Sequence, residues 1–185
     1  MEMFDVRTPQ GDPTGEVKER SAVHRTVTGM APPIYAGAPR EGRIELLLQK
    51  RSRTKESFPG CYDTSCAGHL SAGDTFLEAA LRELEEELGI AASGEELYFA
   101  GIYPCQVDDY FGGKHILDRE ISAVYLYEKP VNEADLRLQA EEVESVCWID
   151  FERLKELAAA GAEGYCIFPW ETSALESAFQ RRYGI

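Results

Sequence analysis

The chain contains 185 residues, of which 44% are hydrophobic and 28% are charged, and its net charge is −14. This length and balance fit one globular domain with its own core and leave too little room for two full domains. A strongly acidic surface disfavours nucleic-acid polymers and anionic membranes as partners. A small anionic substrate is still compatible with this charge if metal ions and a few local cations offset the field.

Targeting signals and cysteine patterns are also informative. No run approaches the roughly 20 apolar residues that a membrane-spanning helix requires. Residues 1–5 lack the basic and apolar stretches of a secretory signal, so we expect a cytoplasmic protein. The five cysteines form no CxxC pair and their number is odd, so a disulfide framework or a cysteine-rich zinc site is not expected. Most of these cysteines are predicted to be small buried apolar residues.

The first half of the chain begins with a polar segment. Residues 1–20 contain Pro9, Gly11, Pro13 and Gly15 and predict an extended, turn-rich lead-in within an N-terminal extension, residues 1–35, that packs on the domain. Residues 44–48 predict a strand. A basic segment, residues 50–55, follows, and residues 58–60 (Phe-Pro-Gly) predict a turn.

The clearest element is a helix over residues 75–88. Thr75 and Glu78 form the T-x-x-E pattern of a capping box. Gly89 stands where a helix C-cap glycine belongs. An apolar stripe at helical spacing is formed by Leu77, Leu81, Leu84 and Leu88.

The second half alternates between strands and helices without a regular repeat. Aromatic and β-branched residues predict strands over 97–107, 121–127 and 143–149, with a loop or hairpin over 108–118. Asp150 is predicted to cap a short helix that ends near Gly161. Residues 168–170 predict a turn before a last helix over residues 171–182. The fold class is therefore α+β, a layered α/β/α sandwich in a single domain over residues 1–185.

Three glutamates of the predicted helix indicate chemistry. Glu83, Glu86 and Glu87 are spaced i, i+3 and i+4 and share an arc of roughly 100° that is distinct from the leucine stripe. Clustered carboxylates repel one another, and a divalent cation reverses that cost. Mg²⁺ prefers carboxylate, water and phosphate oxygens. Without further context, a solvated acidic helix face is the commoner interpretation of the same three residues.

The sequence around these glutamates is more specific than the glutamates alone. Residues 68–90 resemble the Nudix box, in which Gly, five residues, an acid and seven residues precede Arg-Glu-apolar-x-Glu-Glu-x-Gly-apolar. The positions that match in register are Gly68, Arg82, Glu83, Leu84, Glu86, Glu87, Gly89 and Ile90. Asp74 stands where the family usually has Glu, which keeps the charge and shortens its reach.

The resemblance implies a mixed sheet between helices and a set of residue roles. Glu83 and Glu87 match the principal metal ligands, with Glu86 as a further ligand or base. Arg82 matches the arginine that orients the glutamates, and Gly68 matches the glycine whose backbone lies close to the metal. The implied cofactor is Mg²⁺, for which Mn²⁺ can substitute.

Residues before the box resemble one branch of this superfamily, the enzymes similar to isopentenyl-diphosphate isomerase. In that branch, cations at the positions of Arg51 and Lys55 hold the diphosphate, and a Gly-His pair matches Gly68 and His69. A solvated basic loop is the alternative for Arg51 and Lys55. The catalytic cysteine of the isomerase precedes that pair, whereas this chain has Ala67 there.

Further differences favour hydrolysis over isomerisation. The cysteine lies one place earlier, at Cys66, and the histidines are limited to His24, His69 and His115. A one-residue shift on a strand sends a side chain to the opposite face. The box glutamates are intact here, whereas the isomerase has a degraded box. Glu120 matches a metal-linked glutamate of the isomerase and is predicted to be a metal ligand or general base, with a strand-edge ion pair as the alternative.

The sequence thus predicts hydrolysis of a diphosphate linkage in a nucleoside diphosphate or another small organic diphosphate. Water deprotonated by Glu86, Glu87 or Glu120 would attack phosphorus in line. The alternatives are isopentenyl-diphosphate isomerase and a non-catalytic Nudix-like ligand-binding module. The sequence is compatible with a homodimer, in which the partner is a second copy of the chain. Candidates for stacking on a base, although packing is the commoner role, are Tyr103, Tyr110, Phe111 and Trp170.

Overall fold

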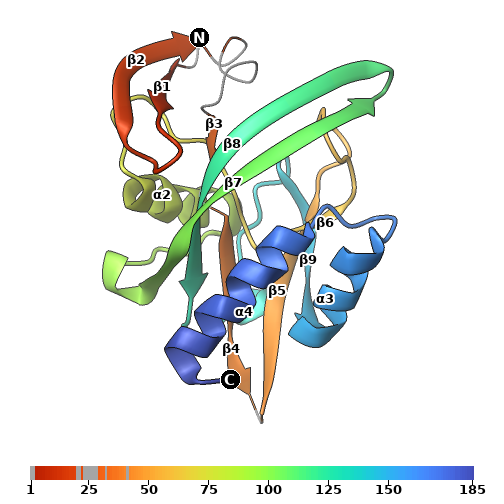
Figure 1. The fold of residues 1–185 in the computed structure, drawn as a ribbon. Coiled ribbons are helices and arrows are strands. Elements are labelled where there is room, and N and C mark those ends of the chain that lie inside the picture. Colours follow the sequence, from red (N-terminus) through yellow and green to blue (C-terminus); the bar gives the residue numbers. More distant parts are fainter. Residues whose placement is uncertain (1–2, 20–21, 23–28, 32, 41) are drawn as a thin grey trace.

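The computed structural model describes residues 3–19, 22, 29–31, 33–40 and 42–185. One mixed sheet forms the centre, with α2 (Phe76–Leu88) on one face and α3 (Phe151–Ala160) and α4 (Pro169–Tyr183) on the other (Figure 1). This arrangement confirms the predicted α+β sandwich. None of the described helices is long and apolar enough to cross a bilayer.

The sheet is built around two neighbouring central strands, β4 (Ile34–Arg40) and β5 (Arg43–Arg51). Its order is β3-β8-β4-β5-β6, with β7 added to β8 and β9 (Val143–Asp150) added to β5. β3 (Gly29–Ala31) and β4 run parallel to β8, and the other pairs are antiparallel. β6 (Tyr62–Asp63) leads into the loop that carries Gly68.

Alternation along β5 explains why the sheet buries both faces. Leu46 and Leu48 join the core under α3 and α4, and Leu47 joins the core under α2. All three side chains are fully buried. A strand covered on both faces reads as a continuous apolar run, and the predicted strand over 44–48 is confirmed and extended at both ends.

The segment predicted as a loop or hairpin is a hairpin. β7 (Leu97–Phe111) and β8 (Lys114–Tyr127) pair along their whole length and extend beyond the rest of the sheet (Figure 1). The turn uses Gly112 and Gly113, whose φ angles of 56° and 81° favour glycine. A short 3₁₀ turn, η1 (Gly94–Glu96), precedes β7, and a second, η2 (Glu133–Asp135), follows β8.

Helix α2 confirms its predicted ends. Thr75 Oγ1 accepts from the Glu78 N–H, and the Glu78 carboxylate accepts from the Thr75 N–H, which completes the capping box. Gly89 closes the helix with a φ of 72°. The leucine stripe was predicted correctly at Leu84 and Leu88, which are fully buried.

Two helix predictions need correction. Leu77 is 36% exposed, and Ala79 and Ala80 are buried in the first turns of the helix instead. Leu77 lies at the edge of the core, where its cover is partial and includes Gly94 of η1. The last helix begins at Pro169 and not at 171, because the Phe168 N–H is bonded to the Glu171 carboxylate and proline fits the first helical position. Helix α3 has the predicted cap at Asp150 and ends at Gly161.

The N-terminal lead-in is also more ordered than predicted. β1 (Met3–Arg7) and β2 (Pro13–Glu19) form a separate antiparallel hairpin beside the start of α2 (Figure 1). Gly11, with a φ of 88°, donates its N–H to Thr8 O in the connecting turn. The sequence did not predict this hairpin, because two short strands in a segment rich in proline and glycine show no clear alternation of apolar and polar residues. His24 lies outside the described residues.

The five cysteines are all free. Cys66 and Cys166 are buried, whereas Cys61, Cys105 and Cys147 are partly exposed, so the prediction that most of them are buried holds for two of the five. Cys66 lies in the core under α2, packed with Leu84 and Leu88.

Candidate active site

The acidic face of α2 divides into a buried part and an exposed part. Glu83 and Glu87, one helical turn apart, are 8% and 4% exposed. Glu86 faces solvent, with a side chain that is 53% exposed. The sequence placed these three carboxylates on one arc, and the packing of the helix leaves two of them inside the protein.

A loop before α2 closes over the two buried carboxylates. A Cβ atom on Gly68 would lie 1.8 Å from Glu83 Cδ, so the Gly68 backbone rests against the Glu83 carboxylate and leaves no space for a side chain. The neighbouring Ala67 N–H donates to Glu87 Oε2 at 3.3 Å. The close approach explains why glycine is required at position 68.

Arg82 binds this arrangement together. Its guanidinium donates to Glu83 Oε1 at 2.6 Å and to the carbonyl oxygen of His69 at 3.1 Å. The same group lies 3.5 Å from Glu86 Oε2 and 3.5 Å from Asp74 Oδ2. The shorter acid at position 74 therefore reaches Arg82, and Arg82 connects the helix to the loop that holds Gly68.

Burial raises the pKa values of both buried glutamates, Glu83 and Glu87. Burial and the neighbouring Glu83 carboxylate together raise the pKa of Glu87 to about 8, and the bond from the Ala67 N–H opposes this rise. Burial also raises the pKa of Glu83, against the opposing charge of Arg82. Two adjacent buried carboxyls of this kind are costly to ionise unless a cation approaches them.

These residues fit a divalent cation. Carboxylate oxygen is the donor that Mg²⁺ and Mn²⁺ prefer, and Glu83 and Glu87 are two such donors, buried one helical turn apart. Within the described ranges, no three His, Cys, Asp or Glu side chains lie close enough together to hold an ion as they stand. Glu86 is the exposed member and has the freedom to change its rotamer.

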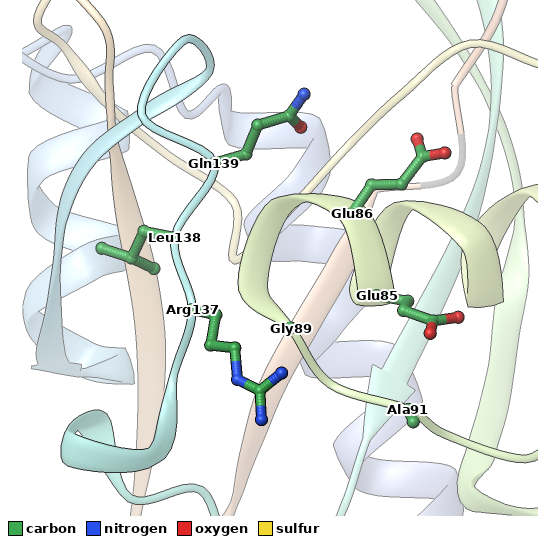
Figure 2. Close-up of a pocket in the computed structure, with 7 residues that line it drawn as sticks. All are labelled: Glu85, Glu86, Gly89, Ala91, Arg137, Leu138 and Gln139. Carbon is green, nitrogen blue, oxygen red and sulfur yellow. The ribbon is translucent and has the colours of Figure 1, made fainter.

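An open pocket of about 780 Å³ lies beside the C-terminal turn of α2. Figure 2 shows Glu86 and Gln139 on one side of this turn, with the Arg137 guanidinium and Glu85 on the other. The Gln139 and Arg137 N–H groups donate to the last carbonyls of α2, Glu87 O and Leu88 O. The pocket thus adjoins the outer, exposed side of the acidic face and does not include Glu83 or Glu87.

Glu120, the predicted carboxylate outside the helix, lies on β8. Glu120 Oε1 is 3.5 Å from His69 Nε2. His69 directly follows Gly68, so the loop that contacts Glu83 also approaches Glu120. The structure therefore brings Gly68, His69, Glu83 and Glu120 into one neighbourhood.

The two predicted cations lie in the same region, and each one is paired with an acid. Arg51 Nη1 donates to Asp63 Oδ2 at 2.8 Å, and its guanidinium also bonds to Ser57 O. Lys55 Nζ donates to Glu142. Lys55 lies close enough to Glu87 to lower its pKa.

Asp63 and Glu142 are the site residues that sequence reasoning missed. Glu142 raises the pKa of Glu87, and its carbonyl oxygen accepts from the Ser52 N–H at 2.8 Å. It reaches the site because β9 pairs with β5, with Val143 opposite Arg51. No local motif marks either residue, and only knowledge of the strand pairing would have revealed them.

The aromatic candidates occupy different places. Tyr103 and Trp170 lie with ring centroids 6.1 Å apart, and the Phe111 ring packs edge-on against Phe58 at 4.5 Å. Tyr110 is 69% exposed on the hairpin arm. Beside it, His115 Nε2 lies 2.7 Å from Asp108 Oδ1.

Comparison with known proteins identifies the family. The sequence profile of the NUDIX domain matches residues 33–170. The chain belongs to the Nudix family. Nudix hydrolase 3 of Arabidopsis thaliana is 38% identical over 168 residues, which are 89% of this chain and 21% of that protein. Isopentenyl-diphosphate Delta-isomerase 1 of Mesocricetus auratus is 34% identical over 140 residues, covering 68% of this chain and 59% of that one.

Solved structures share this fold. The NUDIX domain of NrtR from Shewanella oneidensis superposes with a TM-score of 0.58 at 11% identity, covering 89% of this chain and 99% of that chain. DR0079 from Deinococcus radiodurans superposes with a TM-score of 0.65 at 18% identity, covering 93% of this chain and 98% of that chain. The curated relatives are longer than the matched region, and this chain spans about a fifth of the Arabidopsis protein and less than two thirds of the isomerase. The predicted family and its mixed sheet between helices are thereby confirmed.

Proposed function

We propose that this chain is a Mg²⁺-dependent hydrolase that cleaves the diphosphate linkage of a nucleoside diphosphate or another small organic diphosphate. One observation carries the proposal: Glu83 and Glu87 are buried side by side under the Gly68 backbone, with raised pKa values. A helix face with only a packing role is not expected to bury two carboxyls that repel each other beneath a loop. The relatives called Nudix hydrolases support the same assignment.

Each residue has a proposed task. Glu83 and Glu87 would hold the cation with Glu86 as a further ligand or base, and Arg82 keeps Glu83 oriented toward Gly68. Bound Mg²⁺ supplies charge neutralisation on the phosphate oxygens and makes a water more acidic. Mn²⁺ is the expected substitute.

Lys55 and Arg51 are proposed to bind the phosphate groups. Lys55 pairs with Glu142, so phosphate binding requires Lys55 to exchange that carboxylate for a phosphate oxygen. Arg51 is fixed by Asp63 and Ser57, and it contributes a positioned positive charge. Charge-assisted bonds of this type are among the stronger polar contacts in proteins.

Bond cleavage forms one bond to phosphorus, breaks another and moves one proton. The oxygen of water bonds to phosphorus, the bond to the bridging oxygen breaks, and the water proton passes to a carboxylate, for which Glu86, Glu87 and Glu120 are the candidates. Glu120 has His69 at 3.5 Å to fix its direction. Positioning and charge neutralisation provide most of the rate in reactions of this class.

A substrate panel tests the proposal. Purified protein is incubated with nucleoside diphosphate derivatives and small organic diphosphates, with Mg²⁺, Mn²⁺ or EDTA, and both products are identified by mass spectrometry. We expect cation-dependent cleavage of at least one diphosphate. The panel includes isopentenyl diphosphate, because one relative is an isomerase. Conversion to the allylic isomer without phosphate release, or tight binding without turnover, would overturn the hydrolase assignment. Sedimentation of the same sample tests the predicted homodimer.

A further inference from the structure

The N-terminal hairpin is placed where it can influence the site. The NUDIX profile begins at residue 33, whereas β1 and β2 span residues 3–19. A two-stranded ribbon is only marginally stable in water, so this one depends on the surface that it covers. Its β2 strand is almost wholly exposed, and its β1 strand buries Phe4 and Arg7.

Strand β1 is bonded to the loop between Gly68 and α2. Three consecutive loop residues take part: the Ala72 N–H donates to Met3 O at 2.9 Å, the Gly73 N–H donates to Asp5 Oδ2 at 2.9 Å, and Arg7 Nη2 donates to Asp74 O at 2.9 Å. The Arg7 guanidinium also lies over the Phe76 ring, 5.2 Å from its centroid. The hairpin therefore forms the outer support of the loop that contacts Glu83.

Phe4 makes the contact that leads directly to the site. Phe4 is 2% exposed, and its ring stacks on the His69 imidazole, with centroids 5.4 Å apart and planes 23° apart. His69 Nε2 lies 3.5 Å from Glu120, and the His69 carbonyl accepts from Arg82. The chain of contacts from Phe4 through His69 thus reaches both Glu120 and the arginine that orients Glu83.

We propose that Phe4 is a positioning residue for the hydrolytic reaction and acts through His69; this inference rests on the proposed function. An imidazole held only at its edge can rotate about its side-chain bonds. A ring stacked on its face fixes the imidazole plane and keeps Nε2 directed at Glu120. Small displacements of supporting residues lower the catalytic rate, because reacting groups must stay within a fraction of an ångström of their productive positions.

The first experiment compares side chains at position 4. Phe4→Leu removes the ring and keeps the apolar volume, whereas Phe4→Tyr keeps the ring. We expect Phe4→Leu to lower kcat by roughly 10-fold at a nearly constant KM, as for lost orientation, and Phe4→Tyr to restore most of it. Val17→Ala, on the exposed β2 strand, is the matched control and should leave kcat unchanged. A Phe4→Leu variant with wild-type kcat would overturn the proposal.

A double-mutant cycle separates positioning from general support of the fold. If Phe4 acts through His69, adding Phe4→Leu to His69→Ala should lower kcat no further. An equal loss in both backgrounds would assign Phe4 a merely structural role. Phe4→Met replaces Phe4→Leu if the leucine variant does not fold, since it also lacks a ring.

A spectroscopic readout makes the test independent of activity. A stacked phenyl ring displaces the proton resonances of the imidazole beneath it, so Phe4→Leu should shift the His69 signals and Val17→Ala should not. Unchanged His69 signals in Phe4→Leu would contradict the proposed contact. A wild-type protein that cleaves no diphosphate would refute the proposed function, whereas an active wild type with an equally active Phe4→Leu would refute this inference alone.

Discussion

Two buried glutamates on opposite faces of the sheet have similar acidity and different surroundings. Burial raises the pKa of both Glu87, on α2, and Glu171, on α4, to about 8. Both Glu171 oxygens accept short bonds, from Tyr35 OH at 2.9 Å and from the Phe168 N–H at 2.7 Å. Among the described residues, Glu87 receives one longer bond, from Ala67 at 3.3 Å, and faces Glu83.

The difference shows why acidity alone does not identify a site. The hydrogen-bonding capacity of Glu171 is used within the protein, in a way that joins the start of α4 to β4. Glu87 keeps unused oxygen lone pairs beside a second carboxylate, which is the condition for binding a cation. A perturbed pKa indicates function only when the group also has unsatisfied capacity in an accessible place.

The largest expected effect is on Glu87 itself. Glu87→Gln should lower turnover by roughly 10³-fold, the scale of losing a catalytic or metal-holding group, while leaving the fold intact. In EDTA at pH 8 the variant should be at least as stable as wild type, because the repulsion with Glu83 is removed. Steady-state kinetics and urea denaturation measure the two quantities. Near-wild-type hydrolysis would remove Glu87 from the proposed role.

Gly68→Ala tests the close approach between the loop and the helix. The added methyl would lie 1.8 Å from Glu83 Cδ, so either the loop or the carboxylate must move. We expect kcat to fall by roughly 10²-fold, because ångström displacements at a reacting centre have that effect. Gly161→Ala, which meets open space at the end of α3, should cost stability without reducing kcat. Equal kinetics for both variants would show that the Gly68 contact is not needed.

A neighbouring pair of cations gives a smaller and more selective effect. Lys55→Met should raise KM for the diphosphate by about 10-fold, since a bond to a charged group contributes about 1.5–3 kcal/mol. Arg53→Met is the matched control, because Arg53 is 77% exposed and pairs with Glu144 on the surface. Binding of a non-hydrolysable analogue, measured by calorimetry, checks the difference. The same loss in both variants would indicate a general charge effect in place of a specific phosphate contact.

Glu171→Gln should change the pH dependence of stability and leave kcat unchanged. The folded pKa of about 8 lies above the ordinary value of 4.5, so the folded state keeps a proton that the unfolded state has released. This contribution to stability is fully present below pH 4.5 and is lost as the pH rises to about 8. The variant should flatten that slope by up to about 1.4 kcal/mol per pH unit, as measured by urea unfolding in EDTA. An unchanged slope, or a large loss of activity, would break the distinction from Glu87.

Local signals in the sequence were sufficient to predict the framework of this protein. The Thr75 capping box, the Gly89 cap and the apolar spacing of Leu84 and Leu88 act within one helix, so they are readable without any tertiary information. The register of the Nudix box followed from the same helix, and it placed Glu83 and Glu87 next to each other. The mixed sheet between helices followed from the resemblance carried by that box.

Only the tertiary structure decided which carboxylates are buried and what surrounds them. Glu86 faces solvent because the axial rotation of α2 on the sheet is set by packing with β5 and β8, which helical spacing does not specify. Glu142 reaches Lys55 through the pairing of β9 with β5, and Phe4 reaches His69 from 65 positions away in the sequence. Contacts between segments so distant in the sequence leave no periodic pattern, because their geometry depends on the whole sheet.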